Sequence, residues 1–204
     1  MAFSKDEILV IQKEADGGNS RAQYNLGWAY LTSYGLQRDY DLAVHWFTKA
    51  ADQGDVVAQM ALYSMYLRGV GVMRDSDKAV DWATKAANQG DVVAQMALYS
   101  MYLRGLGVTR DNNKAVYWAK KAAESGNVQA QAHLGLAYLR GVGVRKEWAR
   151  GFAWMSLALL YGYRPFHHRV SLFFIRKFTN DTELRDANTM IRNWLEERRR
   201  KLAS

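Results

Sequence analysis

The chain has 204 residues and a formal net charge of +8 at pH 7, and 49% of its residues are hydrophobic. This apolar content is ample for a continuous core, so we expect one extended folded domain. The absence of cysteine excludes disulfide bonds and thiolate metal sites.

A short helix is predicted first, within residues 1–18. Ser4 and Glu7 have the spacing of a capping box, in which each side chain bonds to the backbone of the other residue. Ile8, Ile11 and Ala15 then recur at intervals that place them on one side of a helix. We interpret this segment as half a repeat that caps the units following it.

Residues 55–90 and 91–126 are two copies of one 36-residue unit, identical at 28 positions. The same frame fits residues 19–54 and 127–162, so four units follow one another without a gap. The positions with the same residue in every unit include Ala22, Ala58, Ala94 and Ala130; Gln23, Gln59, Gln95 and Gln131; Leu26, Leu62, Leu98 and Leu134; and Tyr30, Tyr66, Tyr102 and Tyr138. Self-similarity at this period is typical of stacked repeats, in which a single unit cannot bury its apolar face alone.

Each unit is predicted to form two antiparallel helices. A glycine precedes the residue at which the first helix of each unit begins, and these starting residues are Asn19, Asp55, Asp91 and Asn127. Asn and Asp accept the unpaired amide hydrogens of a first helical turn, and glycine allows the left-handed conformation that ends a helix. Asp39, Asp75 and Asp111 can cap the second helices in the same way. Ser33 and its neighbours replace the double-glycine turn of the other units, so we expect a differently shaped turn there.

The two near-identical copies differ along one side of the second helix. Four of their eight differences, at positions 77, 81, 84 and 88 of the earlier copy, are spaced so that they share one helix face. We predict that this stripe is solvated. The tryptophans at the repeated position are predicted to be structural, packing among small residues: Trp46, Trp82, Trp118 and Trp154.

Residues 163–204 are predicted to cap the other end with two helices. Pro165, the only proline, marks the end of the periodic pattern. The apolar residues that fit the two helices are Val170, Phe173, Phe174 and Phe178 for one, and Leu184, Ala187, Ile191, either Trp194 or Leu195, and Leu202 for the other. This segment holds ten Lys or Arg residues against five acids, so most of the positive excess belongs to it.

The recurring pattern of Ala-Gln, Leu, Tyr, Gly-x-Gly-Val, Arg-Asp, Lys-Ala-Val, Trp and Lys-Ala-Ala resembles the Sel1-like repeat, a relative of the tetratricopeptide repeat. Four in-phase copies over residues 19–162 are far more specific than one short motif. The resemblance implies an all-α fold, a right-handed α-solenoid of about four helix-turn-helix repeats with a capping segment at each end. Gly27 and Gly135 agree with the family pattern, but Tyr63 and Tyr99 do not, which predicts a different spacing or curvature in the middle units.

The resemblance also implies a binding groove. The first helices of a helical solenoid line its concave face, and in tetratricopeptide relatives that face takes peptides or partner helices. The corresponding residues here are Arg21, Tyr24 and Trp28; Val57, Met60, Ser64 and Arg68; Val93, Met96, Ser100 and Arg104; and Gln129, Ala132, Leu136 and Arg140. Their spacing keeps each set on one helix face, and the arginines could meet acidic groups on a partner. We therefore expect a non-catalytic adaptor that captures a peptide or protein segment, and by analogy a bacterial regulator or an immunity protein against a secreted toxin.

Two alternatives remain open. Methionines at helical spacing serve either as adaptable contacts for a partner or as filler between helices. The basic C-terminus is either a solvated helix end or a contact for nucleic acid or an anionic membrane, through Arg192, Arg198, Arg199, Arg200 and Lys201.

Catalysis, metal binding and cofactor binding are not expected. None of the four histidines belongs to a metal motif, and no Walker loop, dinucleotide fingerprint or nucleophile elbow occurs. The N-terminus does not resemble a secretory signal, and no stretch is long enough to span a bilayer. We therefore expect a cytoplasmic protein, or a periplasmic one if a leader has been removed, with a protein or peptide as its partner.

Overall fold

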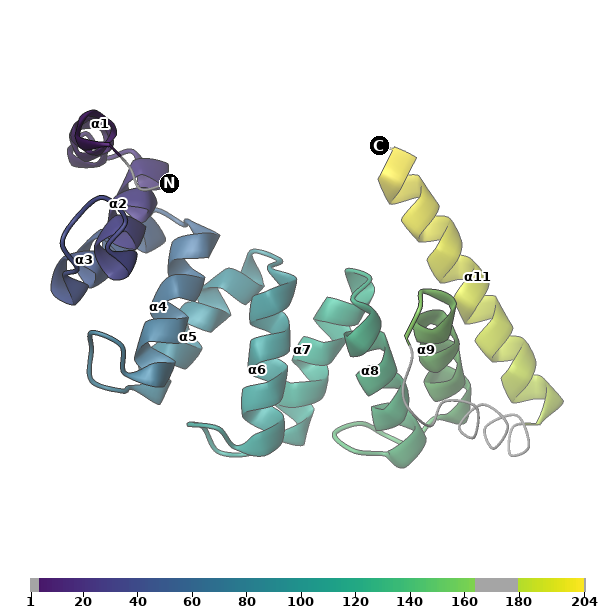
Figure 1. Ribbon diagram of the computed structural model, residues 1–204. Helices are drawn as coiled ribbons and strands as arrows, with labels where there is room; N and C mark the ends of the chain where they lie inside the picture. The colour runs from purple at the N-terminus through teal and green to yellow at the C-terminus, as the bar shows by residue number, and fades with distance from the viewer. Residues whose placement is uncertain (1–3, 164–179, 204) are drawn as a thin grey trace. The chain divides into compact units, whose positions relative to one another are not determined.

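The computed structural model describes residues 4–163 and 180–203, which form ten helices and no strand (Figure 1). In chain order the helices are α1 (Lys5–Asp16), α2 (Ser20–Thr32), α3 (Tyr40–Asp52), α4 (Val56–Arg68), α5 (Ser76–Asn88), α6 (Val92–Arg104), α7 (Asn112–Glu124), α8 (Val128–Arg140), α9 (Trp148–Leu160) and α11 (Asp181–Ala203). The helix α11 is the second helix of the predicted C-terminal cap. Pro165 and the helix predicted from Val170, Phe173, Phe174 and Phe178 lie outside the described residues.

The chain divides into two compact units. Unit 1 comprises residues 1–101 and 105–109, and unit 2 comprises residues 102–104 and 110–204. Unit 1 therefore holds α1 to α5 and most of α6, whereas unit 2 holds α7, α8, α9 and α11.

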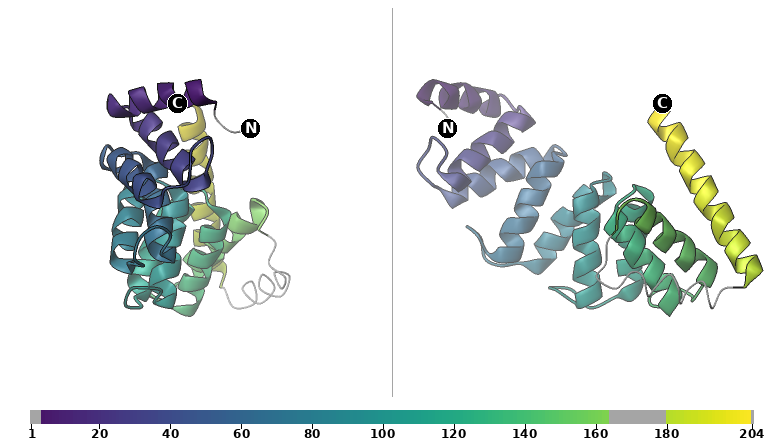
Figure 2. Two further views of the ribbon diagram at one scale, coloured as in Figure 1. Left: turned by 60° about the vertical axis from the view of Figure 1, so that its left-hand side comes forward. Right: turned by 45° about the vertical axis from the view of Figure 1, so that its right-hand side comes forward.

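Helices that are neighbours in the sequence pack side by side within each unit. In unit 1, contacts join α1 to α2, α2 to α3, α3 to α4 and α4 to α5. In unit 2, they join α7 to α8, α8 to α9 and α9 to α11, and Figure 2 shows α11 running beside α9. The predicted all-α repeat fold is confirmed.

The predicted caps place the helix ends correctly. The side chains of Asn19, Asp55, Asp91 and Asn127 each accept a hydrogen bond from the amide three residues later, over 2.7 to 2.9 Å. The glycine before each of them has a φ between 89° and 93°. Only glycine adopts this conformation at little cost, so each Gly-Asn or Gly-Asp step ends one helix and starts the next. Ser4 and Glu7 also form the predicted capping box.

The turn in the first repeat differs less than its sequence suggests. Ser33 has φ 61° and ψ 33°, close to the φ 70° and ψ 39° of Gly69 in the second repeat. The expected difference in turn shape is therefore absent at Ser33 itself but present two residues later, where the Gly35 amide donates to the Ser33 carbonyl over 3.1 Å and Gly35 has φ 89° against 69° for Gly71. The helices impose the backbone, because the same bond closes both turns: the Asp39 amide donates to the Tyr30 carbonyl as the Asp75 amide does to that of Tyr66.

A buried glutamine ties each repeat to the helix before it. The Nε2 of Gln59 in α4 donates to the Ala51 carbonyl at the end of α3 over 3.0 Å, and its Oε1 accepts from Nε2 of Gln89 over 2.9 Å. The glutamines at the same position in the other repeats make the same bond to the carbonyl eight residues earlier, and all four are at most 4% exposed: Gln23, Gln95 and Gln131 with Gln59. This ladder holds the second helix of one repeat against the first helix of the next.

The first and second repeats fill the space between their paired helices with different residues. A Cβ added to Gly27 would lie 2.8 Å from the Phe47 ring, so Phe47 occupies the space that a side chain at position 27 needs. In the second repeat, Tyr63 stands at the glycine position and Ala83 at the phenylalanine position. Because the large and small residues exchange places, the departure from the family pattern at Tyr63 is matched by the facing helix.

Candidate protein-binding surface

The predicted groove residues of unit 1 lie on the first helices of its repeats, α2, α4 and α6. Three large apolar side chains are exposed there: Trp28 is 45% exposed, Val57 48% and Val93 67%. Arg68, at the end of α4, is exposed, and Ser64 and Ser100 are half-buried. Each first helix of unit 1 therefore presents one large apolar side chain to solvent.

The half-buried side chains of Tyr24, Met60 and Met96 share one position of the repeat. The Tyr24 ring packs on Phe47 of α3, with the ring centroids 5.6 Å apart. Burial, and after it the charge of Asp55 at the start of the next repeat, raises the pKa of Tyr24. The two methionines are thus neither fully exposed contacts nor fully buried filler.

In unit 2 the residue at this position of the repeat is buried. Ala132 is completely buried in a cluster with Met155 and Ala158 of α9, so its assignment to the groove is wrong. Leu136 is half-buried against the same cluster. The reason is the facing helix, where Met155 is larger than the alanine at the same position in the second and third repeats.

The polar groove residues of unit 2 remain accessible. Gln129, Arg104 and Arg140 are exposed. His133, which the sequence did not assign to the groove, is half-buried near Arg104, and burial followed by the charge of Arg104 lowers the pKa of the imidazole. The lowered pKa favours the neutral form of His133, so this residue contributes less positive charge than an ordinary histidine.

The C-terminal basic residues are not equivalent. The Arg198 guanidinium lies 5.4 Å from the Tyr161 ring centroid and 5.1 Å from that of Trp194, and its side chain is half-buried. Arg192, Arg199 and Arg200 are exposed, and the side chain of Lys201 lies outside the described residues. One of the arginines considered for a phosphate contact is thus engaged within the molecule.

The repeat tryptophans are not equally buried. Trp46 and Trp118 are 6% and 8% exposed, whereas Trp82 and Trp154 are half-buried. The Trp154 ring lies 6.4 Å from that of Trp194 in α11, but Trp82 lines an open cavity that the sequence analysis did not predict. The difference between the near-identical copies at position 81, next to Trp82, was the available signal.

Two classes of site are absent from residues 4–163 and 180–203. No group of three or more His, Cys, Asp or Glu side chains is placed there to hold a metal ion. None of the helices in these ranges combines the length and apolar character needed to cross a bilayer.

Two solved structures resemble this chain over most of its length. A protective antigen present in uropathogenic Escherichia coli strains, which displays an SLR fold, is 32% identical over 94% of this chain and 41% of that one, with a TM-score of 0.75. A Sel1 repeat protein from Oxalobacter formigenes is 31% identical over 87% of this chain and 50% of that one, with a TM-score of 0.71. The chain thus spans at most half the length of either protein. The comparison with curated proteins gave no match.

The Sel1 repeat profile matches the chain four times, at residues 20–55, 57–91, 93–127 and 128–160. Sel1 repeat proteins generally mediate protein–protein interactions, and the family is generally a non-enzymatic scaffold. Because these four matches cover most of the helical array, the chain belongs to the Sel1 repeat family.

Proposed function

We propose that the protein is a non-catalytic adaptor that binds a peptide or protein segment on the first-helix surface of unit 1. This surface consists of the exposed side chains of Trp28, Val57, Val93 and Arg68, the half-buried side chains of Met60 and Met96, and the half-buried Ser64 and Ser100 on the same helices. The observation that carries the proposal is the exposure of one large apolar side chain on each of α2, α4 and α6. Aromatic and arginine side chains supply much of the binding energy at protein interfaces, and methionine adapts to varied partners.

The sequences of α4 and α6 support an extended partner. The two helices are identical over all thirteen residues, so they offer the same side chains twice, one repeat apart. An extended segment with two similar apolar residues could place one on each helix. The exposed side chains of this surface are mostly apolar, which favours recognition by apolar contact, with an acidic residue of the partner near Arg68.

The finer proposal is a bacterial regulatory or immunity role. Both solved relatives come from bacteria, and one of them is described as a protective antigen. A gene for a secreted toxin beside the gene of this protein would support the immunity role. The nucleic-acid or membrane alternative is less favoured, because Arg198 is stacked on Tyr161 and Trp194 rather than free for phosphate.

The experiment compares the double variant Val57→Asp/Val93→Asp with the wild type as bait, using affinity capture followed by cross-linking mass spectrometry. Asp in the first turn of a helix interacts favourably with the helix dipole, so the fold should persist, and circular dichroism checks this. The matched control is Met73→Asp, which adds a charge at a side chain that is 90% exposed and lies outside the helices.

We expect the wild type and the Met73→Asp control to cross-link one partner at α4 and α6. The double variant should weaken binding of that partner by about tenfold or more. Equal binding by all three folded proteins, or cross-links confined to other helices, would refute the proposed surface. Affinity that falls steeply with salt, and that is lost when Arg199 and Arg200 are replaced, would favour the phosphate-binding alternative.

A further inference from the structure

The indole of Trp82 is open where two other repeat tryptophans are covered. In the first repeat, the His45 ring packs edge-on against Trp46 with centroids 5.2 Å apart. In the third repeat, Tyr117 packs in the same way against Trp118, at 4.9 Å. In both repeats, an aromatic ring of the residue immediately before the tryptophan therefore packs against it.

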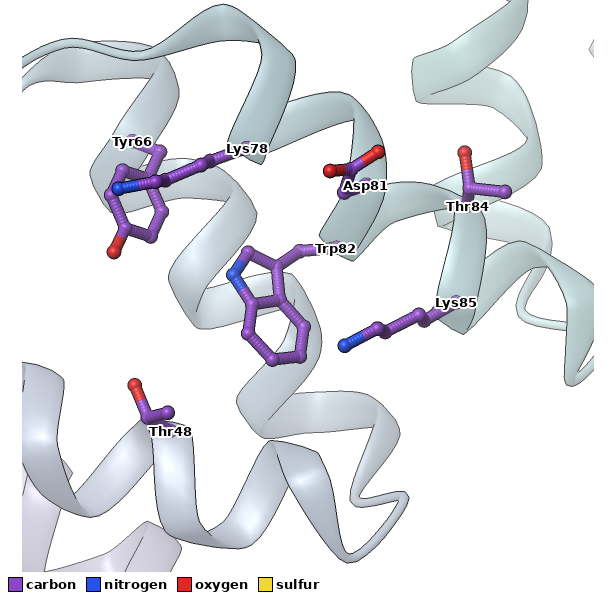
Figure 3. A pocket seen from close by; sticks show the side chains of 7 residues that line it. All are labelled: Thr48, Tyr66, Lys78, Asp81, Trp82, Thr84 and Lys85. Atoms are coloured by element: carbon purple, nitrogen blue, oxygen red, sulfur yellow. The ribbon is translucent and has the colours of Figure 1, made fainter.

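The second repeat has Asp81 at this position, and an aspartate has no ring to place over Trp82. A cavity of about 480 Å³ opens there, with the indole as one wall (Figure 3). Thr48 of α3 and Tyr66 of α4 line the cavity together with residues of α5. Its volume falls within the range of roughly 300–1,000 Å³ that is usual for ligand sites.

Two lysines of α5 point into this opening. The Lys85 ammonium lies 3.8 Å from the Trp82 ring centroid, and the Lys78 ammonium lies 5.2 Å from that of Tyr66. Figure 3 shows both side chains extending toward the rings, with Trp82 between them. The cavity is therefore lined by the aromatic rings of Trp82 and Tyr66, and it has a lysine ammonium group on either side.

Each lysine has only a weak acidic neighbour in the molecule. Lys85 lies 3.9 Å from Asp52, and Lys78 lies 3.7 Å from Asp75, with both lysine side chains more than half exposed. Exposed pairs at such distances contribute little, so both ammonium groups can bind a carboxylate from another molecule. Asp81 also lines the cavity, next to the two lysines.

We propose that this cavity, the Trp82 site, is a docking site for an acidic segment of a partner protein. Two carboxylates of the segment bind Lys78 and Lys85, and an apolar side chain between them packs on the indole. The site uses residues distinct from the first-helix surface, so it stands independently of the function proposed above. Asp81 keeps the site open, since an aromatic residue there would cover the tryptophan as in the neighbouring repeats.

The test is a selection of displayed random short peptides on the full-length protein, with counter-selection on Asp81→Tyr. This variant carries the residue that the near-identical third repeat already has, so it should fold and close the cavity. A synthetic peptide of the selected sequence is then titrated against the wild type, Asp81→Tyr and Lys78→Glu/Lys85→Glu. The matched control is Lys114→Glu/Lys121→Glu, the same positions in the third repeat, where Tyr117 covers the tryptophan.

We expect the selected peptides to contain two acidic residues flanking an apolar one. Both cavity variants should bind the synthetic peptide at least about tenfold more weakly, and the control should bind it as the wild type does. The proposal is overturned if no peptide is enriched over the Asp81→Tyr counter-selection, or if the enriched peptides are neutral or basic. It is also overturned if a fluorescent oligothymidylate, rather than the acidic peptides, binds the wild type more tightly than it binds Asp81→Tyr. The Val57→Asp/Val93→Asp variant should retain the peptide, which separates this result from the test of the first-helix surface.

Discussion

The hydrogen bond between Gln89 and Gln59 offers a direct test of how adjacent repeats are held together. Replacing Gln89 with Ser, the residue that the third repeat has at this position, removes the donor that lies 2.9 Å from Gln59 Oε1. Gln59 is 3% exposed, so its oxygen would remain buried without a partner. The oxygen of Gln95 is natively in that state.

The expected loss of stability follows from the cost of an unsatisfied buried acceptor. Such a group costs about 1–3 kcal/mol, so we expect Gln89→Ser to lower the free energy of unfolding by about 2 kcal/mol. For a chain of this length, that corresponds to a fall in Tm of roughly 4–8 °C. The Nε2 of Gln59 keeps its bond to the Ala51 carbonyl, so the fold itself should be unchanged.

A double-mutant cycle isolates the bond. Gln59→Met removes the buried acceptor, and in that background Gln89→Ser should be nearly neutral, because Gln89 has lost its partner. Urea denaturation followed by circular dichroism measures the four proteins. Ser125→Ala, at the position of Gln89 in the next repeat, is the control and should change stability by less than about 0.5 kcal/mol. If Gln89→Ser lowers the free energy of unfolding by the same amount in the wild type and in Gln59→Met, the hydrogen bond does not contribute to stability and the reasoning is refuted.

Two further predictions concern packing and pH. Gly27→Tyr should lower the free energy of unfolding by about 3 kcal/mol, because the new side chain meets the Phe47 ring. Adding Phe47→Ala should restore most of that stability, since the two changes together recreate the residue pair of the second repeat. Urea midpoints that fall additively would contradict this prediction. Because burial and Arg104 lower the pKa of His133 in the fold, the unfolded chain binds the extra proton, and stability is lost as the pH falls below the ordinary histidine value of 6.5. The Tm of the wild type should therefore fall more between neutral and mildly acidic pH than that of His133→Gln, and parallel curves would refute the assignment.

The repeat frame and the helix ends could be predicted from the sequence because they depend on local chemistry. Asp55 caps α4 through an amide three residues away, and Gly54 ends α3 through its own backbone conformation. Neither feature requires knowledge of a distant residue. Ser33 marks the limit of this reasoning, since the packing of its two helices imposes a left-handed turn that its side chain does not favour.

The tertiary structure decided which side chains stay accessible, because exposure depends on the residue opposite. Met60 and Ala132 share one position on the first helix, yet only Ala132 is completely buried, against Met155 of the facing helix. Trp82 lines a cavity together with Thr48 of α3 and Tyr66 of α4, and these residues come together only in the tertiary structure. Periodicity determined which residues form each helix of the repeats and local capping chemistry determined where it begins and ends, while the residues packed against each helix decided which of its side chains stay accessible.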